Sequence, residues 1–202
     1  MARISACIVF LGTAAAACAA PETRSVWSGV FTEAQAARGE AAYTAECSRC
    51  HKDDLSAYGG VLVGQKFMDQ WREDSLDSFF TILRQTMPRN APASLGNGVY
   101  LDIVAYVLRM NAFPAGDKEL TTESLPGIRV EGKDGPEPVP DFALVEAVVC
   151  LAQASDGTWA VTNASEPVRT RNPDDSTTLE LQALKSKPLG AHTFHLLDFA
   201  SV

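Results

Sequence analysis

The 202-residue chain has few of the residues that build metal clusters, disulfide frameworks or basic binding faces. It contains three histidines and five cysteines, and its 17 lysines and arginines are outnumbered by 25 aspartates and glutamates. A net charge of −8 argues against nucleic acid as a partner, because phosphate binding needs a basic face. After residue 20 no segment approaches eighteen consecutive apolar residues, so we expect no membrane span.

The first twenty residues have the order of a secretory signal peptide. Arg3 is followed by a short apolar run and then by small residues up to Ala20. This run is too short to cross a bilayer, and the alanine-rich end suits a signal peptidase. We therefore predict a signal peptide over residues 1–20 and a periplasmic or other extracytoplasmic location. An alternative is that Cys18 becomes a lipidated N-terminus, so that the protein is lipid-anchored instead of soluble.

The rest of the chain divides into three stretches. Residues 31–113 have helical periodicity, residues 142–202 are strand-like, and residues 114–141 between them are rich in proline and glycine. The composition of the middle stretch predicts a linker or a surface strap without a regular element. We therefore predict a mainly α domain followed by a small β domain.

Local patterns predict three helices in residues 31–113. Thr32 to Gln35 has the form of a capping box, so a helix begins there and runs into Cys47. Ser75 precedes a second helix with apolar residues at i, i+3, i+4 and i+7. A third helix has one apolar stripe, formed by Tyr100, Ile103, Val104, Val107 and Leu108. Three such helices bury little surface, so we expect a prosthetic group to complete the core.

The reactive side chains are concentrated in Cys47, Cys50 and His51. Two thiols three positions apart can each add to a haem vinyl group, which holds the adjacent imidazole under the iron. A thioredoxin-like pair is expected after a strand, whereas this pair follows a predicted helix. A zinc site would need further ligands, and the remaining candidates lie beyond the proline-rich stretch: Cys150, His192 and His195. We therefore predict one covalently bound haem c, with iron ligated by His51.

Met87 is the candidate sixth iron ligand. It lies 36 residues after His51, at the end of a predicted helix and before Pro88, which would stop that helix. A soft sulfur ligand favours ferrous iron and raises the reduction potential, as an electron carrier requires. Met68 and Met110 are interpreted as packing residues.

Other side chains have two interpretations each. Phe67, Trp71 and Phe79 line the haem crevice or simply belong to the core. Arg72 or Arg84 binds a haem propionate or is a solvated charge. His192 and His195 could in principle replace Met87, although histidines on a distant strand-like segment are more often surface residues.

Together these residues resemble a monohaem class I cytochrome c domain. The matching pieces are Arg38-Gly39-x-x-x-Tyr43-x-x-x-Cys47-x-x-Cys50-His51, Leu62-Val63-Gly64, Thr86-Met87-Pro88 and a closing helix over residues 100–111. More narrowly, Met87-Pro88-x-x-Ala91-Pro92 and residues 102–116 are similar to cytochrome domains found with quinoprotein (PQQ) alcohol dehydrogenases. The resemblance implies three to four helices around one haem, with the first and last helices in close contact at Gly39 and Tyr43.

The resemblance also implies a function. Such a domain transfers single electrons from a periplasmic dehydrogenase to an oxidase or another cytochrome, so we expect an electron carrier and not an enzyme. One position departs from the family, which often has a proline before Leu-x-Gly whose carbonyl accepts the N–H of the proximal histidine. Here Val61 stands at that position, and we expect its carbonyl to accept from His51 in a less rigid loop.

Residues 142–202 give a weaker pattern. Residues 142–150 alternate in part, and residues 158–162 and 193–199 are short β-prone runs. These strands are few for a closed barrel, so we expect an incomplete OB-like barrel or an open sheet whose edge could pair with a partner. Cys150 is interpreted as a buried apolar thiol.

Two further functions stay open. One is a haem enzyme or ligand sensor, which would need an open or easily displaced sixth position. The other is an adaptor in which the β domain binds a partner and the haem is accessory. The sequence contains no paired carboxylates, Ser/His constellation or phosphate-cradling loop that would support other catalysis.

Overall fold

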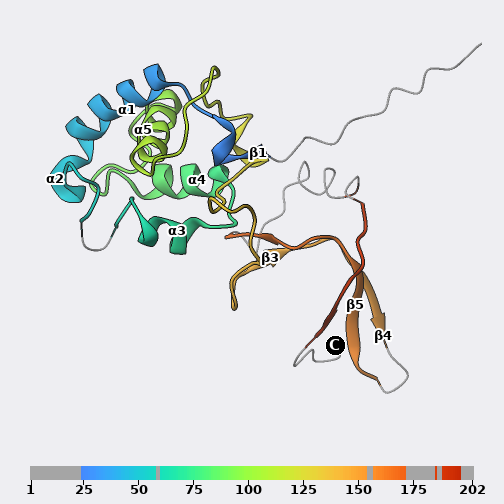
Figure 1. The fold of residues 1–202 in the computed structure, drawn as a ribbon. Helices are drawn as coiled ribbons and strands as arrows, with labels where there is room; N and C mark the ends of the chain where they lie inside the picture. The colour runs from blue at the N-terminus through green and yellow to red at the C-terminus, as the bar shows by residue number, and fades with distance from the viewer. Residues whose placement is uncertain (1–23, 58–59, 154–156, 172–184, 186–187, 197–202) are drawn as a thin grey trace, which may run out of the picture.

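A computed structural model of the chain describes residues 24–57, 60–153, 157–171, 185 and 188–196. The predicted signal peptide, including Cys18, and the end of the last predicted strand lie outside these ranges. Within them no helix is both long and apolar enough to cross a membrane. Figure 1 shows a helical body from which a group of β-strands extends.

In the described part of the chain, five α-helices form the body. They are α1 (Glu33–Glu46), α2 (Ser48–His51), α3 (Gln65–Trp71), α4 (Leu76–Thr86) and α5 (Asn97–Met110). The three helices predicted from periodicity correspond to α1, α4 and α5, while α2 and α3 are short additional helices. The mainly α fold predicted for this part of the chain is therefore confirmed.

Side-chain caps set the starts of α1 and α4. Thr32 Oγ1 accepts the Gln35 N–H at 3.1 Å, and Ser75 Oγ accepts the Ser78 N–H at 3.1 Å. The Gln35 side chain does not complete the predicted capping box. Instead it donates to the Leu120 carbonyl at 3.1 Å and accepts the Leu120 N–H at 2.8 Å. It therefore fastens α1 to the proline-rich stretch.

Helices α1 and α5 cross at a contact that admits no side chain. A Cβ atom built on Gly39 would lie 1.8 Å from the Asp102 carbonyl oxygen, which is far inside van der Waals contact. One turn later the Tyr43 ring packs on Tyr106, with 5.2 Å between ring centroids. The predicted apolar stripe of α5 is buried over its whole length. The crossing expected from the family resemblance is therefore present.

The proline-rich stretch differs from the expected linker. It holds a 3-10 helix, η2 (Leu125–Gly127), and a strand, β2 (Ile128–Arg129), which pairs in parallel with β1 (Arg24–Ser25) just before η1 (Val26–Ser28). Four of its apolar side chains are at most 2% exposed: Leu120, Leu125, Ile128 and Val130. The prediction of a stretch without regular elements was wrong here, because prolines and glycines do not prevent the apolar residues between them from entering the core.

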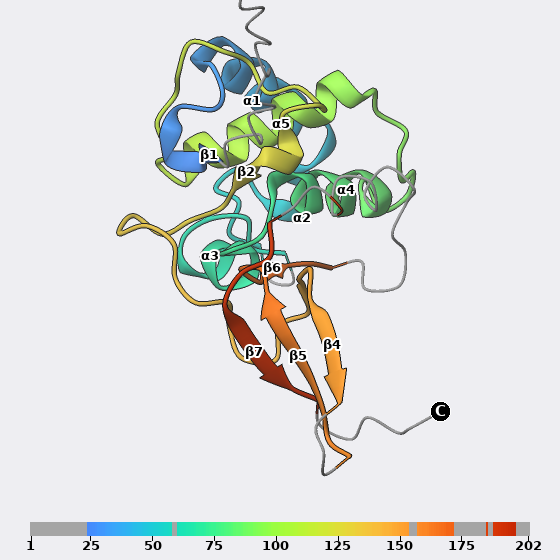
Figure 2. The same cartoon turned by 90° about the vertical axis from the view of Figure 1, so that its right-hand side faces the viewer.

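The strands after residue 141 form two small sheets. β3 (Val145–Glu146) pairs with β6 (Val168–Arg169), and β4 (Cys150–Gln153), β5 (Trp159–Ala164) and β7 (His192–His195) form an antiparallel sheet in the order β4-β5-β7. Over the described strands the arrangement is open and not a closed barrel. Figure 2 shows this sheet projecting from the helical body. Cys150 is half-buried instead of buried as predicted.

Two arginines fasten the β region to the body. Arg169 donates to the Arg72 carbonyl at 2.9 Å, and Arg171 Nε donates to Asp74 Oδ2 at 2.6 Å. The Arg171 guanidinium also lies 4.4 Å from the centroid of the Trp71 ring. Because the Asp74 side chain is completely buried, this ion pair is shielded from water on one side. The β region is therefore attached to the turn that follows α3.

Candidate functional site

The two thiols and the imidazole predicted to bind haem share one short helical segment. Cys47 ends α1, and the His51 N–H donates to the Cys47 carbonyl at 2.9 Å within the next turn. Lys52, with φ of 59°, then ends α2. Both thiols are free, with Cys47 half-buried and Cys50 exposed. Burial raises the pKa of Cys47 to about 11, so this sulfur is a protonated thiol at neutral pH.

A carbonyl oxygen orients the His51 ring, but it belongs to a different residue from the one expected. The His51 Nδ1 atom lies 3.2 Å from the Gly60 carbonyl oxygen, so the predicted role of Val61 is wrong. A Cβ atom on Gly60 would lie 2.7 Å from His51 Cε1, so only a bare backbone can pass this close. With its hydrogen on Nδ1, the ring has its basic nitrogen at Nε2, which is the form that binds a metal.

Met87 occupies the end of α4, as predicted. Its N–H donates to the Leu83 carbonyl at 2.9 Å, and its own carbonyl accepts the Tyr100 hydroxyl at 2.7 Å. The side chain is partly buried and packs against the core. Pro88 follows, and the backbone of Met87 is extended, so the helix ends here. The sequence did not indicate the contact with Tyr100, because the apolar periodicity of α5 assigns that residue only to the core.

The donor chemistry of these residues fits haem c. On the same helical body several apolar side chains pack on the core while part of their surface stays exposed: Leu62, Val63, Met68, Ile82, Met87 and Leu95. Two free thiols followed by an imidazole are the donor set that covalent haem attachment requires.

The three aromatic residues predicted near the haem form part of the core. Phe67, Trp71 and Phe79 are each at most 2% exposed. The Trp71 and Phe79 rings lie 4.8 Å apart, and the Phe67 and Phe79 rings 5.6 Å apart, between centroids. Protein side chains already surround these rings, which favours the packing interpretation of the two that the sequence left open.

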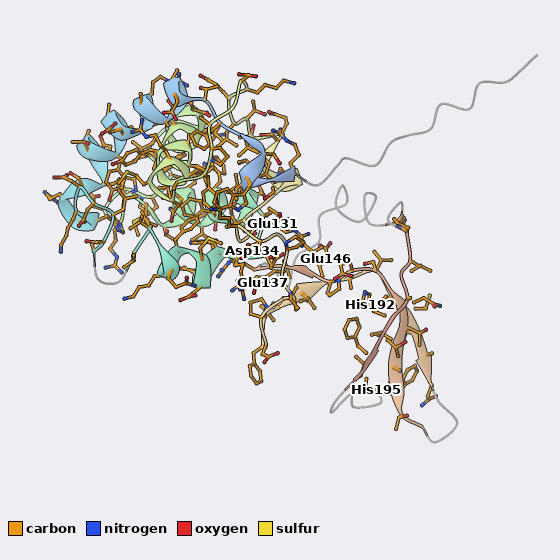
Figure 3. All side chains as sticks on the ribbon, viewed as in Figure 1. Glu131, Asp134, Glu137, Glu146, His192 and His195 are labelled. Atoms are coloured by element: carbon orange, nitrogen blue, oxygen red, sulfur yellow. The ribbon has the colours of Figure 1, made fainter. Side chains whose placement is uncertain are left out.

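The remaining candidates lie at separate places. Arg72 forms an ion pair with Glu137, whereas Arg84 is exposed in the last turn of α4. Met68 packs against the core as predicted, but Met110 is 36% exposed. Figure 3 shows His192 and His195 on the projecting sheet, away from the helical body that carries the cysteines. The His192 ring lies 2.8 Å from a Glu166 carboxylate oxygen.

Comparisons with known proteins bear on the helical body. Residues 34–107 match the family model of cytochrome c oxidase, cbb3-type, subunit III. This match covers less than half of the chain and includes the cysteine motif and Met87. No curated protein is significantly similar to the chain in sequence.

Among solved structures, the sulfane dehydrogenase SoxCD from Paracoccus pantotrophus is similar at 17% sequence identity and a TM-score of 0.37. The likeness covers 65% of this chain and 86% of that chain, and is too weak to assign a fold or a partner. The family match and the single Cys-x-x-Cys-His motif inside it agree on the type of domain that residues 34–107 form. The chain therefore carries a cytochrome c domain, a module that binds haem c and transfers electrons.

Proposed function

We propose that the protein is an exported c-type cytochrome that carries single electrons from a periplasmic dehydrogenase to an oxidase or another cytochrome. Cys47 and Cys50 would hold one haem through thioether bonds, and His51 and Met87 would ligate its iron. The observation that carries this proposal is the turn from Cys47 to His51, which places both thiols and the oriented imidazole on one element of the family-matched domain.

The protein contributes ligand orientation on the histidine side. The Gly60 carbonyl lies within hydrogen-bonding distance of His51 Nδ1, which favours the tautomer that leaves Nε2 free to bind a metal. Glycine at position 60 permits this orientation, since a side chain there would push the ring aside. Oriented in this way, His51 can offer Nε2 to the iron of a bound haem.

On the methionine side the protein fixes the main chain of the candidate ligand. Met87 is held at its N–H by α4 and at its carbonyl by α5. When haem is bound, thioether ligation favours the ferrous state and raises the reduction potential. A filled sixth position suits electron transfer and opposes the binding of small ligands, which separates this function from that of a haem enzyme or sensor.

The proposal is tested by the visible spectra of the exported protein in both oxidation states, beside Met87→Ala and Met68→Ala. Met68 is the matched control because it too is a half-buried methionine that packs on the core. We expect the weak far-red band of sulfur bound to ferric haem in the parent and in Met68→Ala, and its loss in Met87→Ala. A high-spin parent that binds carbon monoxide readily would instead indicate an enzyme or sensor.

The partner is expected to be basic. The chain has a net charge of −8, and the exposed residues at the cysteine motif include the acids Glu46, Asp53 and Asp54 together with the cations Arg49 and Lys52. Redox partners dock through small, weak interfaces, and opposite charges speed their encounter. The rate of electron transfer to the partner should therefore fall as ionic strength rises. A rate insensitive to salt would contradict this part of the proposal.

A further inference from the structure

Two buried tyrosines place a polar hydroxyl in the core of the helical body. Tyr43 on α1 and Tyr100 on α5 are each 1% exposed, and they lie on the two helices that cross at Gly39. Each hydroxyl donates to a main-chain carbonyl outside its own helix. The acceptor of Tyr43 is Lys52, directly after His51, and the acceptor of Tyr100 is Met87 itself.

On the histidine side, the Tyr43 hydroxyl lies 2.8 Å from the Lys52 carbonyl oxygen. Lys52 ends α2, and its N–H donates to the Ser48 carbonyl at 2.7 Å. The Tyr43 ring is itself held against Tyr106. The short turn that carries the imidazole is thus fixed to the last turn of α1 by a rigid side chain.

On the methionine side, the Tyr100 hydroxyl lies 2.7 Å from the Met87 carbonyl oxygen. The Tyr100 ring meets Phe80 of α4 edge-on, with 6.4 Å between centroids. Because α4 accepts the N–H of Met87 and α5 donates to its carbonyl, both main-chain polar groups of this residue are paired with different helices.

Packing alone does not account for these hydroxyls. A phenylalanine would fill the same space without the desolvation that a buried hydroxyl requires. Each hydroxyl is partnered, and among the described side chains no buried nitrogen or oxygen atom lacks a partner. The two groups therefore act as specific ties between the crossed helices and the turns that bear the candidate ligands.

We propose that Tyr43 and Tyr100 are positioning residues that hold the two iron-ligand turns through their main chains, with Tyr100 keeping Met87 in place. The inference rests on the proposed function for the identity of the ligands. The two tyrosines lie on helices that touch backbone to backbone at Gly39, so both ties start from one rigid crossing.

The test compares Tyr100→Phe with Tyr43→Phe, each of which removes one oxygen atom and leaves the ring. Added imidazole competes with the thioether for ferric iron, so its affinity reports how firmly Met87 is held. We expect Tyr100→Phe to bind imidazole about tenfold more tightly than the parent, the size of effect that one lost buried hydrogen bond gives. In Tyr43→Phe the affinity should stay within about twofold, because its hydroxyl contacts the opposite turn.

A second measurement does not depend on which residue ligates the iron. Amide hydrogen exchange of the full-length exported protein, as isolated, should become faster over residues 88–93 in Tyr100→Phe and over residues 52–55 in Tyr43→Phe, each without change in the other segment. Equal behaviour of the two variants in both experiments would overturn the inference. A parent protein without the sulfur band would instead refute Met87 ligation, and the exchange pattern would still decide whether the tyrosines hold these turns.

Discussion

The helical body and the β region use similar apolar side chains in opposite ways. In the body, Phe67 and Phe79 are at most 2% exposed, whereas in the β region Phe142 is fully exposed, Leu151 is 55% exposed and Phe194 is 39% exposed. The described strands form sheets of two and three strands, which are too small to bury either face without another layer. Strand-like patterning therefore predicted elements in the β region but did not imply a core.

The attachment between the two regions differs in kind from the packing within the body. The body is held by apolar contacts and by the backbone crossing of α1 and α5. The β region is fixed to it by Arg169 and Arg171, through a carbonyl, a buried carboxylate and an indole ring. We expect mutations to separate these two modes, with effects that decrease in the following order.

The largest effect is expected at the helix crossing. Gly39→Ala would bring a methyl group into steric overlap with the Asp102 carbonyl. It should lower the free energy of unfolding by about 3 kcal/mol or more, or prevent folding. Gly98→Ala is the control, because a Cβ on that helical glycine meets nothing within 4 Å and should be neutral or stabilising by up to about 1 kcal/mol. Denaturant unfolding of both variants measures the difference, and equal stabilities would contradict the crossing as described.

A matched pair of phenylalanines tests the contrast directly. Phe67→Ala should lower the free energy of unfolding by about 3–5 kcal/mol, because the ring is completely buried among other rings. Phe194→Ala on exposed β7 should change it by less than about 0.5 kcal/mol. A cost for Phe194→Ala close to that for Phe67→Ala would show that the β region has a core of its own.

A smaller effect is expected at the attachment of the β region. Arg171→Gln leaves the buried Asp74 carboxylate without its charge partner and should cost about 2 kcal/mol. Adding Asp74→Asn should recover most of this loss, whereas Arg169→Gln removes only a contact to a carbonyl and should cost less. If the double variant is no more stable than Arg171→Gln, the ion pair does not explain the attachment.

The smallest effect concerns pH. Burial raises the pKa of Glu73, although its carboxylate accepts the Glu137 N–H and lies 3.7 Å from Arg129. The folded state therefore holds this proton to higher pH than the unfolded state does. Protonation of Glu73 therefore stabilises the folded state. This contribution is complete below the ordinary glutamate pKa and is lost as pH rises through the folded-state pKa.

Glu73→Gln should remove that part of the pH dependence of stability. Glu119→Gln should change the pH dependence of stability in the opposite sense. Arg38 lowers the pKa of the Glu119 carboxyl, so the ionised carboxylate stabilises the fold at higher pH and this contribution is lost as pH falls through the folded-state pKa. Unfolding curves measured across the acidic range distinguish the two variants. Parallel pH profiles for the parent and Glu73→Gln would show that Glu73 titrates alike in both states.

Local signals predicted much of the body. The caps at Thr32 and Ser75 and the stripe of α5 lie within one or two helical turns, so sequence spacing alone locates these helices. The ends of helices were also informative, since Pro88 placed Met87 at the end of α4. The cysteine motif is likewise contiguous, so its residues had to lie together.

Long-range contacts were not predictable in the same way. The acceptor for His51 is Gly60 instead of Val61, and the neighbouring Leu62 N–H bonds back to the Leu55 carbonyl, a pairing that the sequence does not indicate. Gln35 and Leu120 are 85 positions apart, and Arg171 and Asp74 are 97 apart. Composition contains no signal for such pairs, which depend on how the completed helices bring the chain back on itself.

The short parallel pair formed by β1 and β2 affects how the domain relates to the rest of its chain. Arg24 lies beside Ile128 and Ser25 beside Arg129, so the polypeptide enters and leaves the helical body at one place (Figure 2). A unit with adjacent ends can be inserted into another chain with little disturbance to the host, and it can be circularly permuted by joining those ends. Adjacent ends of this kind make the helical body a candidate for insertion or permutation experiments in which β1 and β2 stay paired.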